Sequence, residues 1–216
     1  MCDRIVRSDL GRAAGTARQL MAPSPLVANM AASPLTRQVY REHVERFGEP
    51  DDAVTYDDDE QSYGQPTRIS IVIWRRCAEV DVTTFSTIGM AAFPMPGAGH
   101  RAELHFTIRR DVDRATVGAV SKFLANLAIH PFVNGTFFDW WHKLQSPRQI
   151  PLFRDATAVL FHPRFVKAGW DTIKFNGVLV KILNVVPITA DEYGIDQVPE
   201  LIDHWRRIDL DLFAPR

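Results

Sequence analysis

The first periodic pattern along the chain predicts a helix over residues 34–47. Its apolar positions recur every three or four residues, which places them on one helical face: Leu35, Val39, Tyr40, Val44 and Phe47. Ser33 and Pro34 favour a helix start, because the serine hydroxyl can accept from a free backbone N–H and proline suits the first turn. Gly48 favours the helix end. The sequence therefore predicts an amphipathic helix with one buried face.

Alternating apolar residues predict strands in the middle of the chain. Residues 69–74 are apolar on both faces, which indicates a central strand. A second strand is expected from Val80 towards Ile88, with a slip in the apolar pattern near Phe85 that favours a bulge. In residues 103–109, Leu104, Phe106 and Ile108 are predicted to face the core. The alternate positions of that strand are predicted to face outward: Glu103, His105, Thr107 and Arg109.

The second half of the chain continues this mixture. A helix is expected after Asp113, with Val117, Val120, Leu124 and Leu127 as its buried stripe and Pro131 as its end. Residues 156–161 predict a short buried strand. Residues 173–186 predict a hairpin around the Asn176-Gly177 turn, ended by Pro187. Pro199 and Glu200 open a last helix.

The order helix, strands, helix, strands, helix predicts an α+β fold with a largely antiparallel mixed sheet packed against helices. Residues 33–210 are expected to form a single domain. Residues 1–32 are interpreted as a disordered leader or as the product of a misplaced start, since Met30 lies just before the first helix.

Composition limits the classes of partner. The formal net charge is -1, which argues against a dedicated nucleic-acid binder. No apolar run approaches the roughly 20 residues that span a bilayer, so no membrane partner is expected. Residues 49–60 contain seven acids and no Lys or Arg, and this segment is interpreted as a solvated connecting loop. A weak calcium site or an attraction for a basic partner are its alternative readings.

The residues that carry chemistry form no recognisable motif. The seven histidines are scattered without metal-ligand spacing, and the phosphate-loop and G-x-S-x-G patterns are absent. These observations argue against a metal site, a nucleotide-binding loop and a recognisable nucleophile. Glu103, Asp139, Asp171 and Asp191 could still meet in a hydrolase-like pocket, which leaves an enzyme of unrecognised type as an alternative.

An aromatic run surrounds Trp140 and Trp141. It is interpreted as core packing or as a binding hot spot, because tryptophan is enriched at the centres of interfaces. Adjacent side chains on a strand point in opposite directions, so one tryptophan is expected inside and the other facing a groove.

Several segments, taken in order, resemble the suppressor-of-fused family. They are Phe85-Ser86-Thr87-Ile88-Gly89-Met90 with Phe93-Pro94-Met95, Ala102-Glu103-Leu104, the helix ending near Ile129-His130-Pro131, Leu160-Phe161, and Val185-Val186-Pro187 through Glu192. The resemblance extends from about residue 33 to 205. Arg109-Arg110-Asp111-Val112 departs from the more apolar or acidic stretch of the family.

The resemblance implies a non-enzymatic, cytoplasmic protein-binding domain with no cofactor, no metal and no catalytic residues. Eukaryotic relatives restrain zinc-finger transcription factors by clamping an extended peptide as an added strand, and bacterial relatives are read as immunity proteins. The expected partner is a protein, such as a cognate toxin or a regulatory protein, and the oligomeric state stays open. An assembly or structural role is a further alternative. The candidate partner-binding residues are Glu103, His105, Thr107, Arg109, Met90, Trp140 and Trp141.

Overall fold

The computed structural model describes residues 33–57, 64–146, 148–163 and 170–216. The expected leader, residues 1–32, lies outside the described residues. The helices are α2 (Pro34–Phe47), α3 (Arg114–Val133), α4 (Ala190–Tyr193) and α5 (Val198–Arg207), with a short 3-10 helix η1 (Met90–Ala92). The strands are β1 (Asp52–Asp57), β2 (Arg68–Trp74), β3 (Thr83–Ile88), β4 (Arg101–Ile108), β5 (Lys143–Gln145), β6 (Ala156–His162), β7 (Thr172–Phe175) and β8 (Val178–Thr189).

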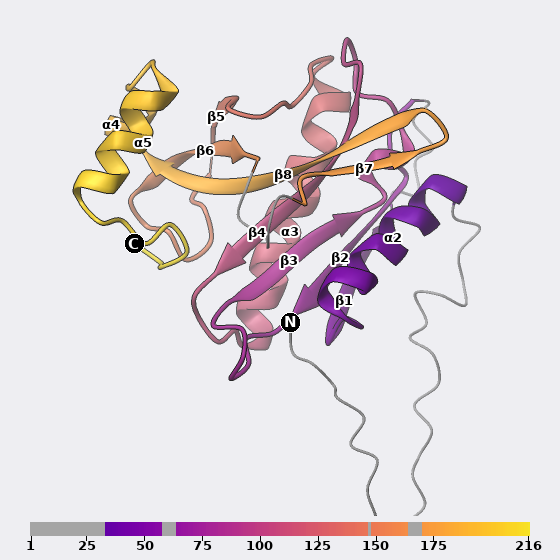
Figure 1. Ribbon diagram of the computed structural model, residues 1–216, viewed down its shortest axis with the longest axis horizontal. Helices are drawn as coiled ribbons and strands as arrows, with labels where there is room; N and C mark the ends of the chain where they lie inside the picture. Colours follow the sequence, from indigo (N-terminus) through magenta and orange to yellow (C-terminus); the bar gives the residue numbers. More distant parts are fainter. Residues whose placement is uncertain (1–32, 58–63, 147, 164–169) are drawn as a thin grey trace, which may run out of the picture.

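The strands form one eight-stranded sheet in the order β1-β2-β3-β4-β8-β6-β5, with β7 paired to β8. Every pairing is antiparallel except that of β4 with β8. The parallel ladder ends at His105 and Asn184, after which β8 continues beside β6. Figure 1 shows β8 crossing the direction of β3 and β4 at a wide angle. The predicted fold class, a largely antiparallel mixed sheet packed with helices, is confirmed.

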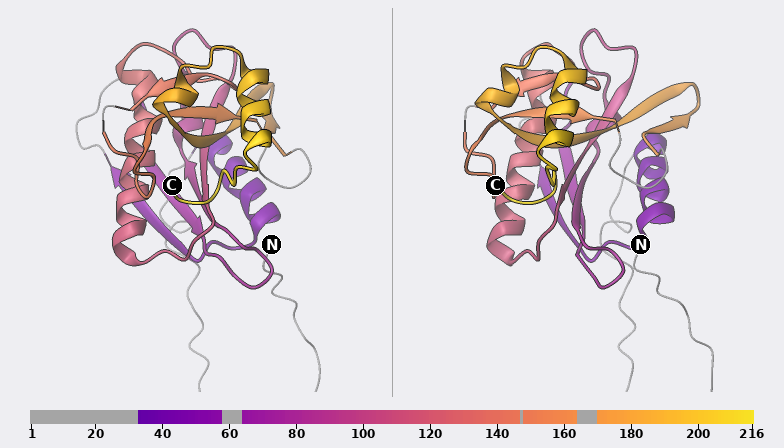
Figure 2. Two further views of the ribbon diagram at one scale, coloured as in Figure 1. Left: turned by 90° about the vertical axis from the view of Figure 1, so that its left-hand side faces the viewer. Right: turned by 60° about the vertical axis from the view of Figure 1, so that its left-hand side comes forward.

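Helices cover both faces of the sheet. Figure 2 shows α3 against one face and α2 against the other, with α5 lying at the far end of the sheet from α2. The main core lies between α3 and the sheet, and a second apolar cluster lies under α2. A third, smaller cluster packs Leu201 and Trp205 of α5 on β6 and β8.

Local sequence signals account for the two long helices. The Ser33 hydroxyl accepts from the Thr36 N–H at the start of α2, and Gly48, at φ 78°, ends it. Asp113 caps α3 by accepting from the Thr116 N–H. The predicted helix 34–47 and the buried stripe of α3 are confirmed.

Two prolines do not end their elements as predicted. α3 continues through Pro131 to Val133, because the fixed φ of proline suits a helix and only one backbone hydrogen bond is lost near its end. β8 continues through Pro187 to Thr189. Pro187 pairs with β6 on one side only and lies beyond the β4–β8 ladder, so its missing N–H breaks no ladder bond there.

Two strand predictions also need correction. The acidic segment is not entirely a loop, because residues 52–57 form β1 and pair with β2 along their whole length. β3 begins at Thr83 rather than at Val80, and Val80 lies in the turn before it. Residues 58–63, which carry the densest acidic run, lie outside the described residues.

The prediction that Glu103 and His105 face outward is wrong, since both have 0% exposure. Alternation identifies the face of a strand, but the face opposite α3 is itself covered by α2. Thr107, near the end of β4, is half-buried, and Arg109, which follows the strand, is exposed.

α3 is the one helix in the described ranges that is long and apolar enough, by length and composition, to cross a membrane. Its stripe of Val117, Val120, Leu124 and Leu127 packs in the main core. Packing on the sheet therefore accounts for its apolar composition.

Gly89 lies in the turn between β3 and η1, and substituting it tests how closely this turn packs against β2. Gly89 has φ 118°, and a Cβ there would lie 2.7 Å from the Arg68 carbonyl oxygen. We expect Gly89→Ala to lower the free energy of unfolding by about 1–3 kcal/mol from the backbone conformation alone, with the clash adding to it. The matched control is Gly118→Ala in α3, where nothing lies within 4 Å of the new Cβ. It should raise stability by about 0.5–1 kcal/mol in urea denaturation. Equal stability of the two variants would contradict this account.

Candidate functional site

The seven predicted partner-binding residues do not form one surface. Met90, Glu103 and His105 are fully buried. Thr107 and Trp140 are half-buried, Arg109 is exposed but ion-paired, and Trp141 lines an open groove. The buried residues belong to a polar interior, and the others lie on two separate parts of the surface.

Glu103 occupies a cradle at the turn that follows β3. Its Oε2 accepts from the Thr87 hydroxyl at 2.6 Å, and its Oε1 accepts from the N–H groups of Gly89 at 2.9 Å and Ala91 at 3.1 Å. Thr87 Oγ1 in turn accepts from the Leu104 N–H at 2.8 Å. Burial raises the pKa of Glu103 to about 7, against these hydrogen bonds, which lower it. The two sequence segments around Thr87–Met90 and Ala102–Leu104 are therefore joined by one carboxylate.

A pair of neutral histidines lies under α2. His43 Nε2 and His105 Nε2 are 2.9 Å apart, and His43 Nδ1 lies 2.7 Å from the Val39 carbonyl. His43 therefore carries its hydrogen on Nδ1 and donates it to Val39, so its Nε2 accepts from the Nε2–H of His105. Trp74, Phe47 and Trp170 enclose the pair.

Burial keeps both histidines uncharged. It lowers the pKa of His43 to about 4 and that of His105 well below its ordinary value, where His43 adds repulsion. Ser86 Oγ lies 2.8 Å from His43 Nε2, which superficially looks like a nucleophile and its base. Ser86 and both histidines have 0% exposure, so no substrate reaches them in this conformation. The cluster joins α2 to the sheet.

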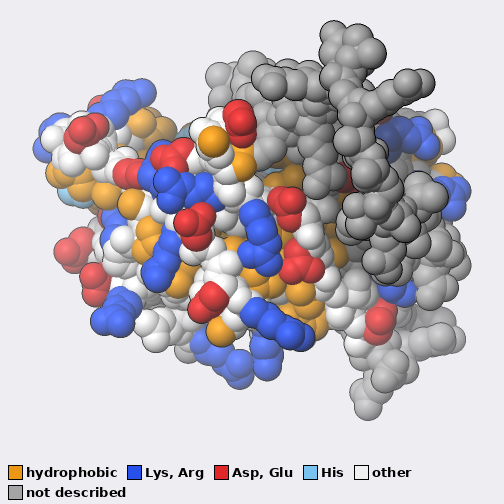
Figure 3. Space-filling view, turned by 90° about the horizontal axis from the view of Figure 1, so that it is seen from below, with side chains coloured by type: hydrophobic (Ala, Val, Ile, Leu, Met, Phe, Trp, Pro, Cys, Tyr) orange, Lys and Arg blue, Asp and Glu red, His pale blue; other side chains and the backbone are white. Residues whose placement is uncertain are grey.

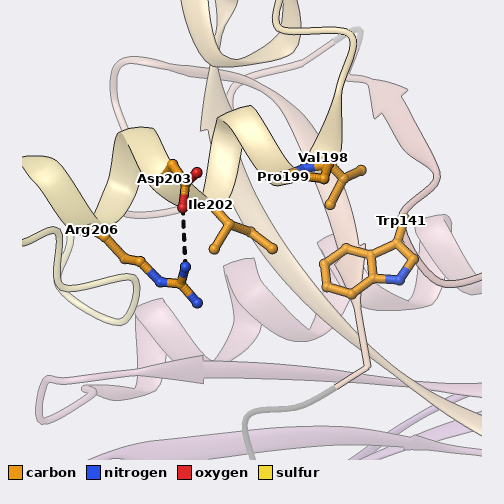
Figure 4. Close-up of a pocket in the computed structure, with 6 residues that line it drawn as sticks. All are labelled: Trp141, Val198, Pro199, Ile202, Asp203 and Arg206. Atoms are coloured by element: carbon orange, nitrogen blue, oxygen red, sulfur yellow. Dashed lines mark hydrogen bonds and ion pairs between the residues drawn. The ribbon is translucent and has the colours of Figure 1, made fainter.

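An open groove of about 640 Å³ lies beside α5. Figure 4 shows the Trp141 ring facing Val198, Pro199 and Ile202. Asp203 and Arg206 form an ion pair at 3.0 Å on its rim. The groove thus combines an apolar wall, a tryptophan and one exposed charge pair.

The backbone of Trp141 is strained, with φ at 71°. Its N–H donates to the Phe161 carbonyl at 2.6 Å, which ties the strained residue to β6. Its ring meets His162 edge-on, with centroids 4.6 Å apart. A non-glycine residue held in this conformation costs about 1 kcal/mol or more, and such strain is concentrated at functional sites.

Trp140 points away from this groove. Its Nε1 donates to the Ile182 carbonyl at 3.3 Å, and Lys181 lies 4.4 Å from the ring centroid. Lys181 also pairs with Asp139 at 2.5 Å. The two tryptophans diverge and Trp141 faces a groove, but both are half-buried, so the expectation that one lies inside is not met. They lie in a turn and not on a strand.

The surface around the lower ends of the strands carries both signs of charge. Figure 3 shows Lys and Arg interspersed with Asp and Glu on this face. Arg109 pairs with Asp81 at 2.6 Å and with Asp211 at 2.7 Å. Within the described part of the chain, no three His, Cys, Asp or Glu residues converge in a way that could hold a metal ion.

Sequence reasoning missed both the histidine pair and the α5 wall of the groove. His43 and His105 come from elements far apart in the chain, and spacing within one element cannot pair them. Trp141 was selected by residue type alone, and the helix that faces it is remote in sequence.

The fold and site define an α+β domain that keeps its polar chemistry inside and offers an aromatic groove outside. The sequence model of the suppressor of fused protein matches residues 65–207. The chain therefore belongs to the suppressor-of-fused family. No curated protein sequence matches it significantly.

Solved structures agree on the fold. A suppressor-of-fused homologue from Neisseria gonorrhoeae superposes with a TM-score of 0.59 at 11% identity, over 84% of this chain and 93% of that one. The Sufu–Fu complex gives 0.53 at 10% identity, over 82% and 83%. Drosophila Suppressor of Fused gives 0.52 at 9% identity, over 82% of this chain and 46% of that protein.

Removing the Glu103 carboxylate should destabilise the fold. Glu103→Ala leaves the N–H groups of Gly89 and Ala91 buried without an acceptor, at about 1–3 kcal/mol for each group. Glu103→Gln keeps one acceptor oxygen and should lose less. Chemical denaturation of both variants measures the difference, and an Ala variant as stable as the Gln variant would show that the cradle is dispensable.

The histidine pair should make stability depend on pH. The folded pKa of His43, about 4, lies below its ordinary 6.5, so the unfolded chain binds more protons between these values. Stability is therefore lost as the pH falls through this window, by about 3 kcal/mol for this group. Ionisation of Glu103, whose pKa is raised to about 7, acts in the opposite direction. Urea unfolding of the wild type and of His43→Gln from pH 4 to 7.5 isolates the contribution of His43. The free energy of unfolding should rise less with pH in the variant than in the wild type. Parallel curves would refute a neutral buried His43.

Proposed function

We propose that this chain is a non-enzymatic domain that binds a protein partner through the groove between Trp141 and α5. The observation that carries the proposal is the strained Trp141, which forms one wall of an open apolar groove. Tryptophan and arginine are the residues most often found at the energetic centres of interfaces, and the groove contains both.

The family supports binding rather than catalysis. A related protein was crystallised as the Sufu–Fu complex, which is a complex with a protein. An enzyme would be favoured by several titratable groups in one open pocket. The described residues do not form such a pocket, because His43, His105 and Glu103 are enclosed. The one carboxylate on the groove, Asp203, is paired with Arg206.

The partner we propose is a cognate toxin or a regulatory protein, with the domain acting as an immunity protein or as a restraint on that regulator. The groove suits an apolar side chain flanked by a charged one. Ile202 and Pro199 supply the apolar contact. A charged side chain of the partner would pair with Asp203 or Arg206 in place of their mutual ion pair and so orient the partner in the groove.

Trp141→Ala should weaken partner binding by about 2 kcal/mol or more, which is roughly thirtyfold in Kd. The full chain serves as bait in native lysate, and the captured protein is then titrated as a purified pair. The matched control is Val133→Ala, an apolar residue with 66% exposure at the end of α3. It should change Kd less than threefold. Loss of affinity in the control, or none in Trp141→Ala while its thermal unfolding is unchanged, would exclude this groove.

A further inference from the structure

The segment Asp209–Arg216, which we call the strap, lies where β4 and β8 separate. The parallel ladder between these strands ends at His105 and Asn184. The strap crosses from one strand to the other beyond that point, since the Arg109 N–H donates to the Phe213 carbonyl at 2.8 Å and Arg216 donates to the Pro187 carbonyl at 3.0 Å. Figure 1 marks its end below α4 and α5, at the side of the molecule away from α2.

Two charged anchors hold the strap. Arg216 donates to both carboxylate oxygens of Glu192, at 2.8 and 2.9 Å, and the Glu192 side chain has 3% exposure. Arg109 donates to Asp211 at 2.7 Å, and its guanidinium lies 5.9 Å from the centroid of the Phe213 ring. The bidentate pair gives Arg216 a defined direction as well as a charge partner.

Apart from these anchors, the strap is only partly buried, and Leu210 and Leu212 are its contacts with the third apolar cluster. Residues 210–216 are all half-buried, whereas Leu201 and Trp205 of the neighbouring α5 are buried. Segments with few buried apolar contacts open at a lower free energy than the core. We therefore expect the strap to open at a lower free energy than the sheet.

Beneath the strap lie two buried polar atoms without a partner among the described residues, His105 Nδ1 and Asn184 Oδ1. Both residues line a cavity of about 10 Å³, which Leu212 and Phe213 close. Both atoms are acceptors. The Nε2 of His105 carries its hydrogen towards His43, and the Nδ2 of Asn184 donates to the His162 carbonyl at 3.0 Å.

The strap places only Leu212 and Phe213 against these acceptors. A segment that supplies a hydrogen-bond donor there would form a hydrogen bond that the strap does not make. Leaving a buried acceptor unpaired is unfavourable. The strap thus fills the cleft but leaves both acceptors without a hydrogen bond. A segment that supplies a donor at this place would bind in its stead.

We propose that the cleft between β4 and β8 is a peptide-binding site occupied by the strap, and that its partner is an extended protein segment with Asp, Phe and Arg at the strap spacing. Arg109 receives the acid and the aromatic ring, and Glu192 receives the arginine. This proposal rests on the proposed function only in that the occupant is a protein, because it uses a surface separate from the Trp141 groove.

The test uses a synthetic peptide of residues 210–216, amidated and labelled with a fluorophore at its N-terminus. Fluorescence anisotropy follows its binding to the full-length wild type and to the full-length Phe213→Ala/Arg216→Ala variant, whose strap lacks two of its contacts. The peptide should bind the variant at least tenfold more tightly than the wild type. A peptide with alanine in place of Arg216 should bind the variant at least tenfold more weakly. Equal affinities in either comparison overturn the proposal.

A second measurement applies even if that variant does not fold. Hydrogen exchange of the wild type reports strap opening through the Arg109 amide, which donates to Phe213. We expect this amide to exchange at least a hundredfold faster than the amides within the β4–β8 ladder. Equal protection would make the strap part of the cooperative core and would overturn the proposal, whereas the Trp141 titration would be unaffected by that result.

Discussion

Glu103 accepts hydrogen bonds at the centre of the sheet from the Thr87 hydroxyl and from the N–H groups of Gly89 and Ala91. A carboxyl group in a dry interior is tolerated only when its hydrogen bonds are made, so the end of β3, the turn and β4 have to keep this arrangement together. This arrangement brings the turn close to the Arg68 carbonyl. A Cβ at position 89 would lie 2.7 Å from that carbonyl oxygen, so only glycine fits there. Met90 is driven inward by the same turn. The parallel pairing of β8 begins on the strand that this cradle fixes.

Helices cover both faces of the sheet, and this limits the places where a partner can reach it. α2 and α5 cover different ends of the face opposite α3, and Ser86, His105 and Asn184 are register neighbours across β3, β4 and β8 between them. At the α2 end this polar row is satisfied by His43. At the α5 end, two of its acceptors stay unpaired. The interior chemistry is therefore structural under α2 and becomes available for binding only where the strands separate.

The helices were predictable because their signals are local, as the caps at Ser33 and Asp113 show. The positions of Glu103 and His105 were not, because alternation reports which residues share a face and not whether a helix from elsewhere covers it. The prediction that Pro187 ends its strand failed for a related reason. The effect of proline depends on which side of β8 is paired at that position. For the groove, the sequence supplied Trp141 but could not supply α5. A tertiary contact between remote segments has no periodic signature.

Strain and incomplete hydrogen bonding occur at both surfaces proposed for binding, and neither feature is confined to them. Leu152 also has a positive φ, and Ser121 Oγ and Trp170 Nε1 are buried without a partner among the described residues. The buried carboxylate, the hydrogen bond between the two histidines and the helix caps each have a direct stabilising role. Trp141 keeps an unfavourable φ, and the cleft beneath the strap keeps unpaired acceptors. A domain selected only for stability would relieve both at little cost, for example with glycine at position 141 or a donor side chain at position 212. The physical argument for placing partner recognition at these two positions is that strain coincides with an open groove at Trp141, and that unpaired acceptors coincide with the point where β4 and β8 separate.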